Sequence, residues 1–265
     1  MPDIGILSGI PFTNSPYKQA FDAGFGGAPS YAFPFEEGFG YNNARFDAGL
    51  LRLNTNFNPP LRLIVVVGGI VAEKRAVANP QRDTISLVGG GSPPNPGGRF
   101  RNRISLESAN SDPLRLAHLA TLHFNRQEIC LLANPNASMT AQEQPIFATT
   151  VLADVGPQTA NPQAVFRAAF GQIGPNIRAV VVSADPWFKQ NSNVLVAEAN
   201  SWATAGKRVC YPFQEYRNDG PTPGQTTLQG PSLIAAYNLL GQLAASVING
   251  TAPPALQVQQ LTLDI

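Results

Sequence analysis

Small, amide, carboxylate and aromatic residues follow the strand-like apolar runs of this 265-residue sequence. In an open α/β sheet, the loops beyond the carboxyl ends of the strands supply the contacts to a ligand. Small residues let backbone N–H groups approach, and aromatic rings supply apolar walls. The pattern predicts binding of a small neutral or zwitterionic ligand. The candidate ligand-binding residues are Ser8, Phe12, Gly68, Gly69, Gly90, Asn134, Asn136, Asp185, Trp187, Phe213 and Glu215.

Each of these residues also has a local explanation. Asn134-Pro135-Asn136 and Asp185-Pro186 are good turn or helix-cap sequences, because Asn and Asp side chains accept from nearby backbone amides. The residues therefore indicate a binding site as a set rather than one by one.

Aromatic residues crowd the stretch from Phe12 to Phe46. Core packing explains most of them, and an exposed patch for a partner is the alternative. Tyr31, Phe33 and Phe35 alternate as the residues of a strand do. Phe12 follows the first strand, so it is the best candidate among them for a ligand contact.

Residues for catalysis or metal binding are few. His118 and His123 are five apart on one predicted helix, 112–124, and no HExxH or CxxC motif exists, so we expect no metal site. Gly68-Gly69 lacks the further glycines of a dinucleotide fingerprint, and we expect no cofactor. Asp154 with Asp185 is the one carboxylate pair that an enzyme on a two-lobed α/β scaffold could use. We expect a protein that is not an enzyme.

The charge and the apolar content of the sequence argue against nucleic acid and membranes as partners. The net charge is +1 and the sequence pI is about 7.8, so no basic surface favours nucleic acid. No apolar stretch approaches the roughly 20 residues that span a bilayer, and we expect no membrane insertion. Cys130 and Cys210 lie in apolar strand-like runs, which favours free buried thiols over a single bridge.

Apolar runs alternate with helical patterns along the chain, which predicts βαβ units with parallel sheets buried on both faces. The expected strands are 3–7, 61–67, 84–88, 128–133, 179–183 and 207–211. The expected helices are 15–23, 43–54, 70–78, 112–124, 162–170, 193–205 and 232–249.

These elements form two sets, so we predict two Rossmann-like lobes in tandem. Between the sets, the Gly/Pro-rich segment 89–102 reads either as a surface loop or as the approach to an interdomain crossing, with 103–106 as the connecting strand. The predicted first lobe is 1–104 plus about 230–252, and the predicted second lobe is 105–229 plus about 253–265.

The chain resembles the substrate-binding proteins of ABC transporters, in the group that binds aromatic amino acids such as tryptophan. The resemblance rests on an ordered set of segments, strongest from about 178 to 260: ADPWF at 184–188, LVAEAN at 195–200, YPFQEY at 211–216, GPSL at 230–233 and NGTAPP at 249–254. Earlier segments fit more loosely: IGILSG at 4–9, Gly68-Gly69 and LANPN at 132–136.

The resemblance implies a type I periplasmic-binding-protein fold, with two α/β lobes joined by a three-crossing hinge. A solute-binding protein of an ABC-type importer would capture a small organic ligand, for example an amino acid with an aromatic or apolar side chain, in the interlobe cleft by hinge closure. Phe12 and Trp187 would contact the apolar part of the ligand. Ser8, Gly68-Gly69 and Asn134 would hold a polar head, and Asp185 or Glu215 would meet an amine. ABC permease subunits would be the partners.

Three features depart from the family pattern. The first residues show no signal peptide, so the family implies a periplasmic or extracytoplasmic location while a cytoplasmic one stays open. The segment 220–229, GPTPGQTTLQ, reads as a Gly/Pro-rich loop that replaces the shorter Gly-rich approach of relatives at one wall of the cleft. The loop 89–98 is unusually rich in Gly and Pro. A non-transport ligand sensor of the same fold is the alternative function.

Overall fold

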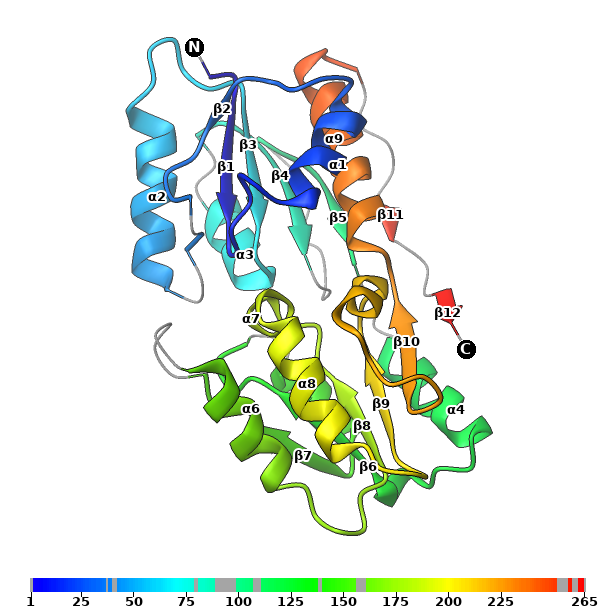
Figure 1. Cartoon of the computed structure of the whole chain (residues 1–265). Coiled ribbons are helices and arrows are strands. Elements are labelled where there is room, and N and C mark those ends of the chain that lie inside the picture. The colour runs from blue at the N-terminus through cyan, green and yellow to red at the C-terminus, as the bar shows by residue number, and fades with distance from the viewer. Residues whose placement is uncertain are drawn as a thin grey trace. The chain divides into compact units, whose positions relative to one another are not determined.

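The computed structural model describes residues 2–36, 38–39, 42–78, 81–88, 99–106, 111–137, 140–155, 161–251, 257–258 and 262–264. The chain divides into two compact units, Met1–Leu106 with Leu233–Gln259 and Glu107–Ser232 with Gln260–Ile265. The chain thus passes from one unit to the other three times (Figure 1). Among the described residues, no helix is long and apolar enough to cross a membrane.

Unit 1 is built on a parallel sheet in which β1 pairs with β2 on one side and with β3 on the other. The sheet order is β2-β1-β3-β4-β5-β11. Leu63–Val67 is buried throughout, as a strand covered on both faces should be. The strands are β1 (Ile4–Ser8), β2 (Tyr31–Ala32), β3 (Leu63–Val67), β4 (Asp83–Val88), β5 (Phe100–Ser105) and β11 (Gln257–Val258).

The helices of unit 1 begin and end at residues suited to those positions. Ser15 accepts from Lys18 N at the start of α1, Pro16 holds the first position, and Gly26 ends the helix in the left-handed conformation (φ +90°). The helices α1 and α9 pack side by side (Figure 1). The helices are α1 (Pro16–Phe25), α2 (Asn43–Thr55), α3 (Ile70–Ala78) and α9 (Leu233–Ile248).

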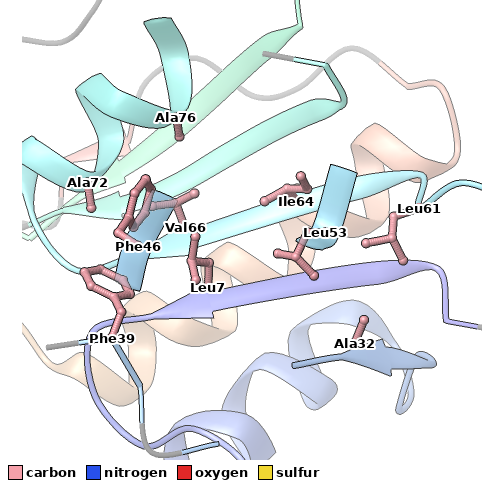
Figure 2. Close-up of a cluster of buried hydrophobic side chains, with 10 residues drawn as sticks. All are labelled: Leu7, Ala32, Phe39, Phe46, Leu53, Leu61, Ile64, Val66, Ala72 and Ala76. Atoms are coloured by element: carbon pink, nitrogen blue, oxygen red, sulfur yellow. The ribbon is translucent and has the colours of Figure 1, made fainter. Parts of the chain in front are cut away.

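A core cluster lies on one face of this sheet. Leu7 of β1 and Ile64 and Val66 of β3 belong to this cluster together with Phe39 and Phe46 (Figure 2). A buried ion pair also fixes α3 on the sheet: Glu73 accepts from Arg103 Nη1 of β5 over 3.2 Å, and from Ser86 Oγ of β4. The start of α3 after Gly69 is therefore held by both apolar and polar contacts.

Unit 2 repeats the same strand order, β7-β6-β8-β9-β10-β12, and only β12 runs antiparallel to its neighbour. Ile129–Ala133 and Ala179–Val182 form its buried centre. The strands are β6 (Ile129–Ala133), β7 (Thr149–Leu152), β8 (Ala179–Val182), β9 (Arg208–Tyr211), β10 (Thr226–Gly230) and β12 (Thr262–Asp264).

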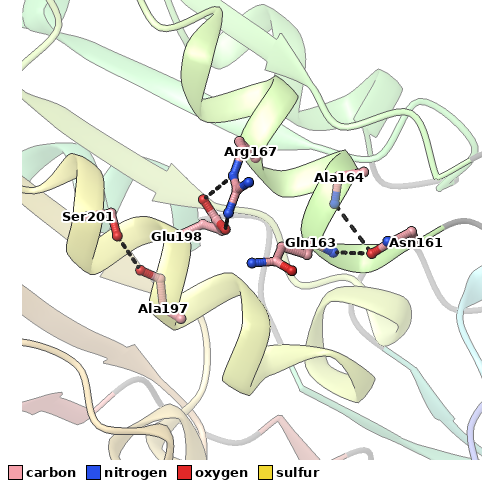
Figure 3. Close-up of polar contacts among 7 residues, drawn as sticks. All are labelled: Asn161, Gln163, Ala164, Arg167, Ala197, Glu198 and Ser201. Atoms are coloured by element: carbon pink, nitrogen blue, oxygen red, sulfur yellow. Dashed lines mark hydrogen bonds and ion pairs between the residues drawn. The ribbon is translucent and has the colours of Figure 1, made fainter.

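The helices of unit 2 are joined by surface polar contacts. Figure 3 shows Asn161 capping α6 at the amides of Gln163 and Ala164, and Arg167 of α6 paired with Glu198 of α8 over 3.0 Å. The helical segments are α4 (Ser111–Thr121), η1 (Arg126–Glu128), α5 (Thr140–Glu143), η2 (Gln144–Ile146), α6 (Pro162–Gly171), α7 (Pro186–Gln190), α8 (Ser192–Trp202) and η3 (Gln214–Asp219).

The structure confirms the two predicted parallel-sheet α/β lobes and the free, buried state of both cysteines. Residues 103–105 form the end of β5, which pairs with β4, and the chain passes from unit 1 to unit 2 after Leu106. Three local predictions were wrong. The segment 220–229 contains most of β10, paired with β9. Only Tyr31 of the alternating aromatics lies in a strand. His123 lies beyond the end of α4, at φ +64°.

Candidate functional site

The identical strand orders place a topological switch point in each sheet. In both units the chain leaves the first strand for one edge and returns to the other side, so β1 and β3 flank the switch in unit 1, and β6 and β8 flank it in unit 2. Ligands of open α/β sheets bind outside the carboxyl ends of the strands at such points. The candidate residues Ser8, Gly68, Asn134 and Asp185 stand at or just beyond these four strand ends.

In unit 1, the carboxyl ends of β1 and β3 are held close together. Gly9 N donates to Val67 O over 2.6 Å, which extends the strand pairing by one residue. Ser8 is 5% exposed, and its Oγ accepts from Ile10 N over 3.3 Å. Gly69 lies in less crowded surroundings than the buried Ser8, because a Cβ placed on Gly69 would meet nothing within 4 Å. Gly69 therefore presents backbone next to open space, as a ligand contact requires.

Phe12 lies in an aromatic cluster of unit 1. Its ring is 2% exposed and lies 6.1 Å from Phe21, 6.1 Å from Phe33 and 5.7 Å from Tyr237, centroid to centroid. Burial raises the pKa of Tyr237 well above its usual value. The cluster joins α1 to α9, and a ligand contact of Phe12 stays a prediction.

In unit 2, a side-chain bridge spans the switch point. Asn134 Nδ2 donates to Asp185 Oδ2 over 3.1 Å, and the two side chains are fully or almost fully buried. Asp185 Oδ1 accepts from Phe188 N over 3.0 Å and so caps α7. Asn134 Oδ1 accepts from Asn136 N over 3.0 Å, which shapes the turn after β6 and leaves Asn136 exposed. The structure thus brings three predicted residues together in one hydrogen-bonded group.

A second buried pair, which sequence reasoning missed, lies beside this bridge. Ser183 follows β8 and donates its Oγ proton to Glu143 Oε2 over 2.6 Å. Both residues are at most 2% exposed. Thr140 Oγ1 donates to Asn134 O, so α5 is also fixed to the end of β6. Glu143 stands in a four-residue helix without apolar periodicity, so no sequence signal marks it.

The other three candidates of unit 2 lie in or next to α7 and η3: Trp187 is in α7, Phe213 directly precedes η3, and Glu215 is in η3. Trp187 of α7 is 7% exposed and its ring lies 5.3 Å from Phe166. Phe213 is 4% exposed and precedes η3. Glu215 is half-buried and accepts from Ser232 Oγ over 2.8 Å.

Lys189 joins α7 to η3. Its Nζ lies 4.7 Å from the ring centroid of Tyr216 and 3.3 Å from Asp219 Oδ2. Tyr216 stacks on Tyr211 at 4.8 Å, and burial raises the pKa of Tyr211 far above its usual value, with Asp219 adding to the effect. This packing fixes the positions of Phe213 and Glu215 relative to Trp187.

Two further predictions concern other residues. Gly90 lies outside the described residues. Asp154 is exposed whereas Asp185 is buried, so the two carboxylates of the enzyme alternative have different surroundings. Among the described residues, no group of three or more His, Cys, Asp or Glu could hold a metal ion.

No protein-family model matches the chain, and no curated protein matches it. Solved structures do. The ABC domain in complex with L-Trp from Streptococcus pneumoniae is 14% identical with a TM-score of 0.65, over 96% of this chain and 88% of that one. The 5-methylthioribose transporter solute binding protein from Thermotoga lettingae is 14% identical with a TM-score of 0.63, over 99% and 86%. The trehalose repressor from Escherichia coli is 9% identical with a TM-score of 0.65, over 98% of both chains.

These similarities define the class of protein by its fold. The two parallel-sheet α/β lobes of this chain match the fold of these solved binding and regulatory proteins. The fold is the type I periplasmic-binding-protein fold. The fold expected from the sequence is therefore confirmed, whereas the tryptophan-binding group is not.

Proposed function

We propose that this protein is the solute-binding component of an ABC-type importer and captures a small organic ligand at the carboxyl ends of its sheet strands. The observation that supports this most strongly is the placement of Gly69 beside open space and of the Asn134–Asp185 bridge at the switch points of two matching sheets. Solved structures with this fold include the ABC domain in complex with L-Trp and the 5-methylthioribose transporter solute binding protein in complex with 5-methylthioribose.

The ligand class that suits these residues is an amino acid with an aromatic or apolar side chain. In unit 2, Trp187 and Phe213 are aromatic side chains that are only 7% and 4% exposed, and the exposed amide of Asn136 offers a polar contact. In unit 1, the backbone at Gly69 lies beside open space. Glu215 is better suited than Asp185 to meet an amine. Asp185 is 1% exposed and both of its carboxylate oxygens accept hydrogen bonds within unit 2, whereas Glu215 is half-buried.

The test is a thermal-shift screen of the L-amino acids, with 5-methylthioribose and trehalose as comparison ligands, followed by calorimetry. A ligand at a hundred times its Kd adds about 2.7 kcal/mol of stability, which raises the Tm of a chain of this size by several degrees. Glu215→Gln should weaken binding of an amino acid at least tenfold. Glu198→Gln, on the α6–α8 surface, is the control and should leave binding unchanged. Stabilisation by sugars alone would contradict the amino-acid class.

A ligand-responsive regulator is the second candidate, because the trehalose repressor has the same fold. In the importer, uptake of the ligand depends on the loaded protein, whereas in the regulator, transcript levels depend on it. Deletion of the gene abolishes uptake of the radiolabelled ligand if the protein serves an importer. Unchanged uptake together with altered transcript levels on ligand addition supports the regulator.

A further inference from the structure

Phe39 contacts both strand ends that flank the switch point of unit 1, at Ser8 and at Gly68. Phe39 N donates to Ser8 O over 2.9 Å, at the carboxyl end of β1. The Phe39 ring packs edge-on against Phe46, with centroids 5.0 Å apart (Figure 2). Phe39 is 4% exposed and belongs to the core cluster with Leu7 and Val66. The backbone N–H of Phe39 is therefore bonded to the end of β1 while its ring is anchored in the core.

Glycines let the ring come this close to the end of β3. A Cβ on Gly68 would lie 2.5 Å from Phe39 Cζ, and a Cβ on Gly38 would lie 2.8 Å from the carbonyl carbon of Gly9. Both glycines have positive φ, +155° at Gly68 and +84° at Gly38. Only residues without a side chain fit at these two positions. The Phe39 ring thus fills the space beside Gly68.

The next residue shows the contrast. Gly69 directly follows Gly68, and a Cβ placed there would meet nothing within 4 Å. The edge of sheet 1 at β3 is therefore closed at Gly68 and open at Gly69. The Phe39 ring therefore lies beside Gly68, one residue before the open space at Gly69.

We propose that Phe39 determines the largest ligand that the carboxyl edge of sheet 1 accepts. This inference rests on the proposed function, since it assigns a role at the same ligand site. Replacing the ring by a smaller side chain opens volume one residue away from the open space at Gly69. Larger ligands then gain affinity relative to smaller ones.

Phe35 provides a matched control. It packs against the same core cluster, and its Cε2 lies near Gly49 rather than near Gly68. Phe35→Ala therefore removes a ring from the same cluster at a different position. Both variants lose stability, so stability alone does not separate the two roles.

The experiment measures the affinities of L-alanine, L-leucine, L-phenylalanine and L-tryptophan by calorimetry for the unchanged protein, Phe39→Ala, Phe39→Leu and Phe35→Ala. The expected result is a shift of the affinity ratio toward the larger amino acids by at least tenfold in Phe39→Ala, a smaller shift in Phe39→Leu, and none in Phe35→Ala. Phe39→Leu keeps an apolar side chain in the core, so it reports on the ratio even where Phe39→Ala fails to fold.

The outcomes separate the two proposals. Binding by the unchanged protein with the same ratio in both Phe39 variants overturns the role of Phe39 and leaves the proposed function intact. An equal shift in Phe35→Ala also overturns it, because the effect would then come from loosening of the cluster. Absence of binding by all four proteins overturns the amino-acid class of the proposed function and the role of Phe39 together.

Discussion

Asn134 donates from Nδ2 to Oδ2 of Asp185 over 3.1 Å, and this buried contact joins the carboxyl ends of β6 and β8. A carboxylate in a buried hydrogen bond contributes about 1.5–3 kcal/mol. Asn134→Asp places two carboxylates face to face and should lower the free energy of unfolding by about 2 kcal/mol or more. Urea unfolding followed by circular dichroism measures this loss.

The exchanged double variant tests the same contact in reverse. In Asn134→Asp with Asp185→Asn, an amide at 185 can donate to a carboxylate at 134 and still cap α7 at Phe188 N. We expect the double variant to recover most of the stability that Asn134→Asp loses. Additive losses would show that the contact does not matter as a pair.

The helices α1 and α9 approach so closely that two glycines are required. A Cβ on Gly241 would lie 2.1 Å from Phe21 O, and a Cβ on Gly24 would lie 1.9 Å from Asn238 O. Gly241→Ala should therefore lower the free energy of unfolding by about 1–3 kcal/mol through overpacking. Gly171→Ala in α6 is the control: a Cβ there meets nothing within 4 Å, so stability should stay constant or rise slightly. Equal effects of the two substitutions would contradict the close packing.

Both thiols should be inert in the native protein. Cys130 and Cys210 are 0% exposed, and burial raises the pKa of Cys130 to about 12. Since the thiolate is the reactive form, Ellman's reagent at pH 8 should label no thiol in the native chain and two in 6 M guanidinium. Rapid labelling of either thiol in the native protein would show that its strand is not buried as described.

His118 should make stability depend on pH. Burial lowers its pKa below the usual value, and the charge of Arg208 lowers it further. The folded protein thus binds this proton less readily than the unfolded chain does, so the contribution is present above the unfolded pKa, about 6.5, and is lost as the pH falls through the folded pKa. His118→Gln should lose less stability than the unchanged protein between pH 7 and pH 5, measured by urea unfolding.

His123→Asn is the control for this pH dependence. It removes the only other imidazole of the chain at a left-handed position that Asn tolerates. The pH dependence assigned to His118 should persist in this variant. If the pH dependence of stability disappeared in His123→Asn, the effect would come from His123 and not from His118.

The centre of each sheet could be predicted because its signal is local. Leu63–Val67 is an unbroken apolar run, and Pro16 and Pro162 stand at the first positions of helices after capping residues. The strand β10 was missed because Thr226–Gly230 carries polar residues that read as a loop. In the fold, Thr227 and Gln229 are each 1% exposed, and Arg115 Nε donates to Gln229 O. Tertiary contacts bury these residues despite their composition.

The candidate site was predictable only as a set of positions. Strand ends identify Asn134 and Asp185, but 51 residues separate them, so their bridge depends on β6 and β8 being neighbours. Phe39 could not be selected from among the aromatic residues around it, because its position follows from close contacts with Ser8 and Gly68. The sequence pattern predicts where the strands end, whereas tertiary packing determines which side chains meet at those ends.

Calorimetric titration of the unchanged protein with L-amino acids tests ligand capture most directly. We predict one-to-one binding of at least one amino acid with an aromatic or apolar side chain, weakened at least tenfold by Glu215→Gln and unaffected by Glu198→Gln. Binding that is equally strong in Glu215→Gln and the unchanged protein, or no heat of binding for any amino acid, would contradict this account.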